Sequence, residues 1–313
     1  MDIFLQQVIN GLTLGSVYAV VALGYTMVYG IIQLINFAHG EVVMIGAMVS
    51  FSVITAIAGA HTGLPPLAIV VCGVLVAVPV CMAVGYTLER VAYRPLRNAP
   101  RLAPLITAIG LSIILQHLAM IIWSRNPIAF PQIITVTPIH ITGNPGGATI
   151  TNVQVAIIAT SVVMMAGLLG LVYRTKLGIA MRATSQNQVV AGLMGIDINK
   201  IIALTFVIGA ALGAVAGVMN GTYYGIAHYQ MGFVLGLKAF SAAVLGGIGN
   251  LGGAMLGGIL LGLIEALGAG YVGDFTGGVF GSNYQDVFAF FVLIAVLIFR
   301  PSGLLGERVS DRA

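Results

Sequence analysis

The chain has 313 residues, of which 59% are hydrophobic and only 7% are charged. Its mean hydropathy is +1.05. Soluble globular domains carry about 25% charged residues, so this composition excludes a soluble domain and predicts an all-α, polytopic integral membrane protein. The net charge of +4 does not indicate nucleic-acid binding, because the basic residues are clustered. Three clusters, 90–101, 174–200 and 300–312, hold four, four and three of the thirteen, as expected for cytoplasmic loops between spans.

Apolar runs of spanning length divide the chain, which we interpret as one transmembrane domain over residues 1–313. At about 20 residues per span, we expect about eight to nine transmembrane helices. The expected spans are 4–29, the run after the polar stretch 35–41 up to about 58, 67–88, 103–123, 153–173, 201–220, 233–247, 251–267 and 287–299.

The segments between these runs differ in character. Pro95 and Pro100 are expected to break any helix in the first basic cluster. The polar segment 124–151 is predicted to be an outer loop, and its loosely alternating Ile and Val residues favour a small β-hairpin. A second outer loop is expected at 268–285.

The basic clusters also fix the orientation. The loop 174–200 and the C-terminal tail are both basic, so both are expected in the cytoplasm, separated by an even number of spans. The four apolar runs that follow the loop 174–200 satisfy this condition only if the turn 247–252 also lies in the cytoplasm. If 233–247 is instead a broken or re-entrant segment, the count changes. Three spans precede the first basic cluster, which predicts an N-terminus outside.

The segment 174–200 is the longest polar stretch that carries several charges. Its apolar residues recur at helical spacing, and a glycine, Gly195, stands where a helix would end. The recurring residues are Ala183, Val190, Ala191 and Met194. We therefore predict a short amphipathic helix on the cytoplasmic face that can serve as a docking surface for another protein.

Few polar groups interrupt the apolar runs. Asn36, His39 and Glu41 follow the first span, where an intramembrane charge is expensive and usually functional. The equal alternative is a plain cytoplasmic turn in which Glu41 is a first-turn acid favoured by the helix dipole. Lys238 and Glu265 either form an ion pair, or each lies near a membrane interface and extends its charged group toward water. We slightly favour the second interpretation.

Glycine spacing predicts close helix packing. In the run 201–220 and just after it, glycines recur every four residues and place a small-residue stripe on one face. These glycines are Gly209, Gly213, Gly217 and Gly221.

No motif indicates an enzyme. No G-x-x-x-x-G-K-[ST] sequence occurs, and the G-x-G-x-x-G match at 247–252 lacks the preceding strand that a dinucleotide site needs. The five histidines are scattered, so we expect no catalytic residues, no metal and no cofactor on this chain. A membrane enzyme would need clustered acid, base or nucleophile residues at one depth.

Several stretches together resemble the LivH-type permease subunit of branched-chain amino acid ABC importers. The similar stretches are 11–19, 23–30, 35–41, 182–197, 236–240, 244–249 and 299–305. The resemblance covers nearly the whole chain. It departs at Ser185-Gln-Asn-Gln188, where related permeases often carry acidic residues.

The resemblance implies a complex in the bacterial inner membrane. Its other members would be a second permease subunit, two cytoplasmic ATPases that bind the ATP, and a substrate-binding protein. The substrates would be leucine, isoleucine and valine, or another small amino acid, an amide or urea.

The resemblance also suggests roles for particular residues. ATPase coupling is assigned to Arg182, Gln188, Ala191, Gly192 and Gly195. The candidates for the translocation pathway are Asn36, His39, Glu41 and Lys238.

The main alternative is an ion-coupled secondary transporter, which would carry a coupling-ion site built from intramembrane acids or broken helices. Glu41 and Glu265 are too few to exclude this alternative, although the cytoplasmic helix argues against it. The residues leave open whether the permease dimer is homo- or heteromeric.

Overall fold

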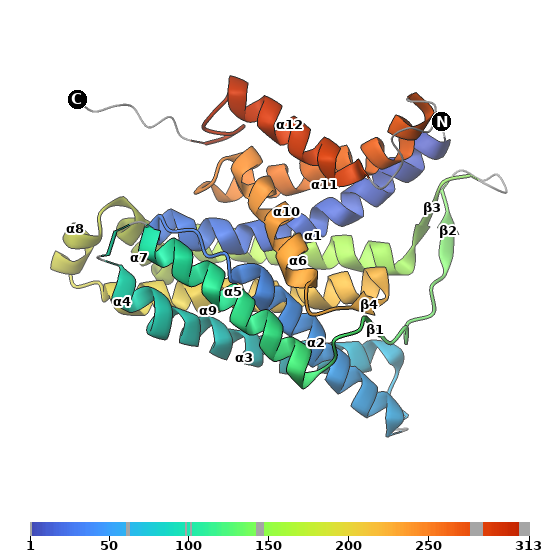
Figure 1. Ribbon diagram of the computed structural model, residues 1–313, viewed down its shortest axis with the longest axis horizontal. Coiled ribbons are helices and arrows are strands. Elements are labelled where there is room, and N and C mark those ends of the chain that lie inside the picture. The colour runs from blue at the N-terminus through green and yellow to red at the C-terminus, as the bar shows by residue number, and fades with distance from the viewer. Residues whose placement is uncertain are drawn as a thin grey trace.

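The computed structural model describes residues 2–60, 63–97, 99–100, 102–141, 147–275 and 284–306. Among these, seven helices are long and apolar enough to cross a membrane, and α10 (Met231–Gly246) and α12 (Gln285–Phe299) are shorter apolar helices. The long helices are α1 (Asp2–Ile32), α2 (His39–Gly59), α3 (Pro66–Leu88) with its continuation, α5 (Leu102–Ile122), α6 (Asn152–Arg174), α9 (Ile198–Tyr224) and α11 (Leu251–Phe275). The chain is an all-α polytopic membrane protein, as the composition predicts (Figure 1).

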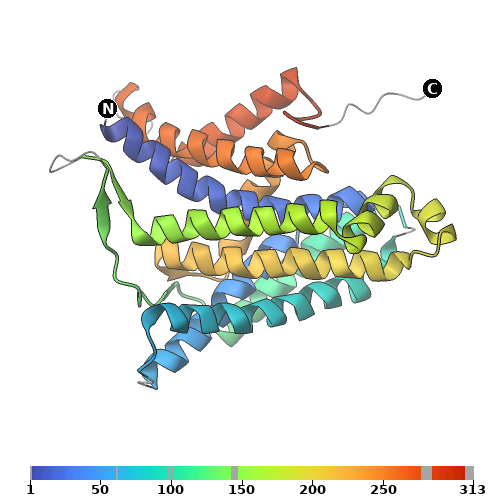
Figure 2. The same cartoon turned by 180° about the vertical axis from the view of Figure 1, so that it is seen from behind.

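Two helices form the centre of this bundle. In its most apolar stretch, 83% of the residues of α1 are buried, and the corresponding share for α9 is 67%. The same share is only 17% for α5 and 22% for the helix that begins with α3. Figure 2 shows α9 lying between α6 and α3. The peripheral helices α3 and α5 therefore present their apolar surfaces to lipid or to another subunit.

Small residues bring α1 and α11 into direct backbone contact. A Cβ added at Gly15 would lie 2.7 Å from the Cα of Ile259, and one at Gly11 would lie 2.8 Å from the Cα of Leu263. In a bilayer, where apolar lipid competes with apolar side chains, such close approach is a main source of helix association.

The predicted helix break in the first basic cluster is wrong in part. After α3 the chain continues through a π-helical turn, η1 (Glu89–Tyr93), into α4 (Arg94–Leu96) without leaving the helical path. Pro95 directly follows the π-helical turn, and local π adjustments of this kind let a membrane helix accommodate a residue without an N–H. Arg101 of this cluster, and Arg308 and Arg312 of the basic tail, lie outside the described residues.

The predicted outer loop 268–285 starts later than expected, because α11 continues to Phe275. Gly268 and Gly270 lie in this extension of α11 and face neighbouring helices. A Cβ at Gly268 would meet Phe288 of α12, and one at Gly270 would meet Gln7 of α1. Tertiary contacts thus override the low helix propensity of glycine.

The predicted hairpin in the segment 124–151 is confirmed but short. Strand β2 (Pro138–His140) pairs antiparallel with β3 (Thr149–Thr151). A second pairing was not expected from the sequence: β1 (Ile128–Ala129) joins β4 (Ile226–Ala227) just after α9.

Hydrogen bonds between segments distant in sequence show which elements lie at each end of the bundle. The backbone N–H groups of Leu304 and Leu305, after α12, donate to the carbonyls of Leu245 and Gly246 at 2.9 Å. The turn between α10 and α11 therefore lies at the same end as the end of α12, as four spans after the loop 174–200 require. The start of α1 lies at the opposite end, where the N–H of Thr149 donates to Gln6 Oε1 at 2.8 Å (Figure 1).

Candidate functional site

Between α6 and α9 the chain forms two short helices, α7 (Lys176–Gln186) and α8 (Gln188–Leu193). Three caps start the helices of this segment in turn. The side-chain oxygens of Thr175, Asn187 and Asp197 each accept the backbone N–H three positions later, at 3.0 to 3.1 Å. Such caps satisfy N–H groups that a helix start leaves unpaired. The polar residues therefore build the segment as a series of defined turns.

The expectation of one continuous amphipathic helix is wrong. Asn187 has an extended backbone with φ −158° and caps α8, because an Asn side chain can offer the backbone an alternative to the continuing helix. The four recurring apolar residues consequently lie on two helices, with Ala183 on α7 and the other three on α8 or at its end. Even within α8 they differ, since Ala191 is 3% exposed and Met194 is 79% exposed.

The predicted stop at Gly195 is confirmed. Its φ is +86°, a value that glycine adopts at little cost. The N–H of Gly195 donates to Gly192 O at 3.0 Å, and the N–H of Ile196 donates to Ala191 O at 3.1 Å. These two bonds form a Schellman motif, which reverses the chain toward the cap of α9.

A group of exposed apolar side chains lies along α8 and just after it, and we call this group the α8 tip. Its members, with exposed fractions of 52 to 82%, are Val189, Val190, Leu193 and Met194. The base of the same helix is fixed, since Gln188 Nε2 donates to the carbonyl of Ile31 at 3.0 Å and Ala191 is buried. An apolar patch on a fixed base is typical of a protein contact surface.

The other predicted coupling residues lie around this tip. Arg182 is on α7, exposed, with its guanidinium 5.3 Å from the centre of the Tyr173 ring. Gly192 is exposed, and a Cβ added to it would find its nearest neighbour, Ile198 Cγ1, at 3.9 Å. A side chain at position 192 therefore fits without disturbing the fold.

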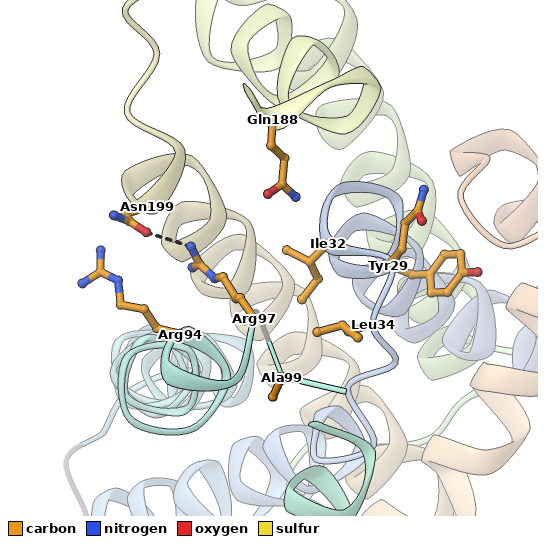
Figure 3. A pocket seen from close by; sticks show the side chains of 9 residues that line it. Tyr29, Ile32, Leu34, Arg94, Arg97, Ala99, Gln188 and Asn199 are labelled. Carbon is orange, nitrogen blue, oxygen red and sulfur yellow. Dashed lines mark hydrogen bonds between the residues drawn. The ribbon is translucent and has the colours of Figure 1, made fainter. Parts of the chain in front are cut away.

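A cavity of about 490 Å³ lies beside α8 and was not predicted from the sequence (Figure 3). It lies between the end of α1, α4 and the starts of α8 and α9. Its lining residues are Tyr29, Ile32, Gln33, Leu34, Arg94, Arg97, Ala99, Gln188 and Asn199. Arg97 donates to Asn199 Oδ1 at 2.8 Å and forms an ion pair with Glu89. The arginines that the sequence analysis treated as orientation signals thus also form the wall of a cavity.

Asn36 and His39 are buried and contact different neighbours. Asn36 Oδ1 accepts the Tyr93 hydroxyl at 2.9 Å, which ties the start of α2 to the π-helical turn. The His39 ring lies edge-on to Tyr25 at 4.9 Å, and a Cβ added at Gly24 would overlap the ring. Neither residue lines the cavity.

Glu41 is fully buried in the first turn of α2. Its Oε1 accepts the Ser112 hydroxyl at 2.9 Å and Gln116 Nε2 at 2.8 Å, both from α5. This geometry differs from a plain cytoplasmic turn, in which an acid would face water. Ser112 and Gln116 had no signal in the sequence beyond being polar residues in an apolar run.

Lys238 pairs with two acids. Its Nζ lies 2.6 Å from Glu265 Oε1 and 2.7 Å from Asp286 Oδ1, and it lies 3.4 Å from the Tyr18 hydroxyl. The pairing alternative is therefore the correct one, and the snorkelling alternative is not. Asp286 was missed, although an acid directly before the last apolar run was a visible signal.

The four-residue glycine stripe of α9 faces several partners. A Cβ at Gly217 would lie 2.8 Å from the backbone N of Ala47 on α2, and one at Gly221 would lie 2.8 Å from the Phe130 ring. Gly209 and Gly213 instead leave room near His39. The stripe thus lies partly against a helix backbone and partly against side chains.

Comparison with known proteins agrees with this architecture. The family model described as branched-chain amino acid transport system / permease component matches residues 7–297. The chain is 48% identical over 304 residues to the high-affinity branched-chain amino acid transport system permease protein BraD of Pseudomonas aeruginosa, covering 97% of this chain and 96% of the relative. It is 45% identical over 306 residues to the corresponding LivH of Escherichia coli, with the same coverage.

A more distant relative is the probable branched-chain amino acid transport permease protein LivH of Methanocaldococcus jannaschii, 26% identical over 298 residues, covering 93% of this chain and 89% of the relative. No solved structure matches the chain. From the match over most of its length and these identities, the chain belongs to the family of permease components of branched-chain amino acid transport systems.

Proposed function

We propose that this chain is a permease subunit of an ABC importer that takes up leucine, isoleucine and valine across the bacterial inner membrane. The relatives at 45 and 48% identity, named as permeases of high-affinity branched-chain amino acid transport, support this substrate class. In this proposal the chain does not itself hydrolyse ATP. Two partner ATPases bind ATP, a second permease subunit completes the pathway, and a substrate-binding protein delivers the amino acid.

The observation that carries the coupling role is the exposed apolar α8 tip on its hydrogen-bonded base. Exposure of aliphatic side chains to water is unfavourable in free energy, and a partner that covers them removes this cost. We infer that the tip docks into an ATPase and that the α7–α8 end of the bundle, with the end of α12, faces the cytoplasm. The basic clusters support this orientation.

The mechanism follows from how the segment is connected. Closure of the ATPases would push α7 and α8, which join α6 directly to α9. Because α9 is central and packs on α1, α2 and α3, a displacement at its start reaches most of the bundle. Short capped helices transmit such a push better than a flexible loop would, and the pathway then opens alternately to each side.

A glutamate at position 192 tests the docking role. Gly192 is exposed with open space around it, so Gly192→Glu should leave the fold intact while placing an unpaired charge in the proposed contact. Burying such a charge costs on the order of 2–5 kcal/mol, and each 1.4 kcal/mol is about tenfold in affinity. We expect at least a ~10-fold loss of ATPase retention, of leucine uptake and of substrate-stimulated ATP hydrolysis.

The matched control is Gly59→Glu, the same change at an exposed glycine at the end of α2, where an added Cβ meets nothing within 4 Å. This variant should assemble and transport normally. If complexes carrying Gly192→Glu keep normal uptake and stimulated hydrolysis, the docking role is wrong.

The substrate is tested separately in proteoliposomes that hold the complete complex. Radiolabelled leucine should be accumulated only with ATP inside, and unlabelled isoleucine and valine should compete, whereas amides and urea should not. Uptake that collapses with an ionophore while ATP stays constant would contradict the ATP-driven mechanism.

A further inference from the structure

The cavity beside α8 is a positively charged space at the proposed docking end. Two of its nine lining residues are arginines and none is acidic. Figure 3 shows Arg94 and Arg97 both reaching toward Asn199, with Gln188 pointing into the same space from α8. The cavity therefore offers two guanidinium groups and side-chain amides in one polar enclosure, which suits a carboxylate or another small anion.

The positive charge in this cavity is only partly neutralised. Glu89 pairs with Arg97, but Arg97 Nε is buried without a hydrogen-bond partner. Burial lowers the pKa of Arg97 and the neighbouring Arg94 lowers it further, whereas Glu89 raises it. An additional anion would relieve this imbalance. The Arg94 side chain is exposed and makes no hydrogen bond or ion pair to any residue that the structure describes.

The cavity adjoins α8, the helix that carries the α8 tip. Gln188 starts α8 and bonds to the end of α1, and Asn199 lies in the first turn of α9. The coupling segment 174–200 carries four basic residues and a single acid, the α9 cap Asp197, so this segment has a net positive charge. A protein that covers the apolar tip would complement that charge with acidic side chains.

We propose that the cavity receives an acidic side chain of the ATPase subunit that docks on the α8 tip, and that Arg94 and Arg97 bind its carboxylate. This inference rests on the proposed function. It adds a second route by which closure of the ATPases displaces the bundle, because α4 continues α3 through the π-helical turn. The ATPase would then move α3 directly, in addition to α6 and α9.

The test uses the complete complex, purified through a tag on this chain. Arg94→Glu reverses the charge of an exposed side chain that bonds to none of the described residues, so the fold should survive. We expect ATPase retention to fall at least tenfold and its dependence on salt to weaken. Arg94→Lys should restore most of the retention, because the charge is kept.

The matched control is Arg90→Glu, the same charge change in the same basic cluster but outside the cavity, where the Arg90 side chain donates a hydrogen bond to the Tyr86 hydroxyl. Retention of the ATPase with Arg90→Glu and its loss with Arg94→Glu support the proposal. Equal loss in both variants, or loss in neither, overturns it, since the arginines would then act only through the general charge of the loop.

A second measurement separates the proposal from a lipid site and from the proposed function. If native mass spectrometry shows that Arg94→Glu releases an anionic phospholipid while the ATPase stays bound, the occupant is a lipid headgroup and the proposal fails. If Gly192→Glu releases the ATPase but Arg94→Glu does not, only the cavity inference fails. If neither variant releases it, the docking role itself is wrong.

Discussion

At the residue scale, two buried glutamates, Glu89 and Glu265, are paired with basic residues, whereas the buried Glu41 is bonded to neutral side chains. Lys238 on α10 neutralises Glu265 on α11, whose side chain is fully buried, and reaches Asp286 on α12. Removing one member of a buried pair leaves an uncompensated charge, which is far more costly than an exposed pair is stabilising. This cluster therefore acts as a link among three helices, whatever its place in transport.

Replacement of the lysine tests this account. Lys238→Met should destabilise the subunit by about 3 kcal/mol or more, seen as a clearly lower melting temperature in detergent. Asp286→Asn is the control, because the Asp286 side chain is 42% exposed and its pair should contribute about 0–1 kcal/mol. Equal melting temperatures for the two variants would contradict a stabilising Lys238–Glu265 pair. Adding Glu265→Gln to Lys238→Met should recover much of the loss.

At the element scale, glycines decide which helix backbones touch. Gly217 lies where α9 crosses α2, and Gly15 lies where α1 crosses α11. By contrast, Gly110 on α5 has nothing within 4 Å of an added Cβ. Gly15 and Gly217 are therefore needed for close helix packing, whereas Gly110 on the peripheral helix α5 is not.

Two alanine substitutions separate these cases. Gly217→Ala forces α2 and α9 apart, and overpacking of this kind costs about 1–3 kcal/mol, so the melting temperature and the yield of folded subunit should fall. Gly110→Ala should be neutral or slightly stabilising, because alanine favours a helix over glycine by about 1 kcal/mol. A Gly217→Ala variant as stable as the Gly110→Ala variant would refute the close crossing of α2 and α9.

At the scale of the whole molecule, the described residues form seven helices long and apolar enough to cross a membrane and two shorter apolar helices, which together would make nine crossings. An odd number places the start of α1 and the end of α12 at opposite ends, as Figure 1 shows. The α8 tip lies with the end of α12, and the segment with Arg125 lies with the start of α1. The proposed orientation puts the first group inside the cell.

Single cysteines test this orientation. In a background with Cys72→Ser and Cys81→Ala, Asp2→Cys and Arg125→Cys should react in intact cells with a membrane-impermeant maleimide. Leu193→Cys should react only after the membrane is permeabilised. Labelling of Leu193→Cys from outside would reverse the orientation and remove the basis for ATPase docking.

The sequence by itself determined the class, the span positions and the chemistry at the helix ends. Long apolar runs admit no other structure in lipid, since backbone groups must be bonded within each span. The stop at Gly195 was predictable because it depends on local backbone conformation. The break at Asn187 was misjudged, because two short helices and one longer helix share the same apolar spacing.

The tertiary structure alone decided what the isolated polar residues do. No local pattern predicts that Glu41 accepts a hydrogen bond from Ser112. Nor does one predict that Lys238 pairs with both Glu265 and Asp286, or that Arg94 and Arg97 line a cavity. These pairings join residues 27 to 71 positions apart or surfaces of four separate elements. They depend on which helices cross and at what depth, and that is set by the close glycine contacts of the assembled bundle rather than by any single segment.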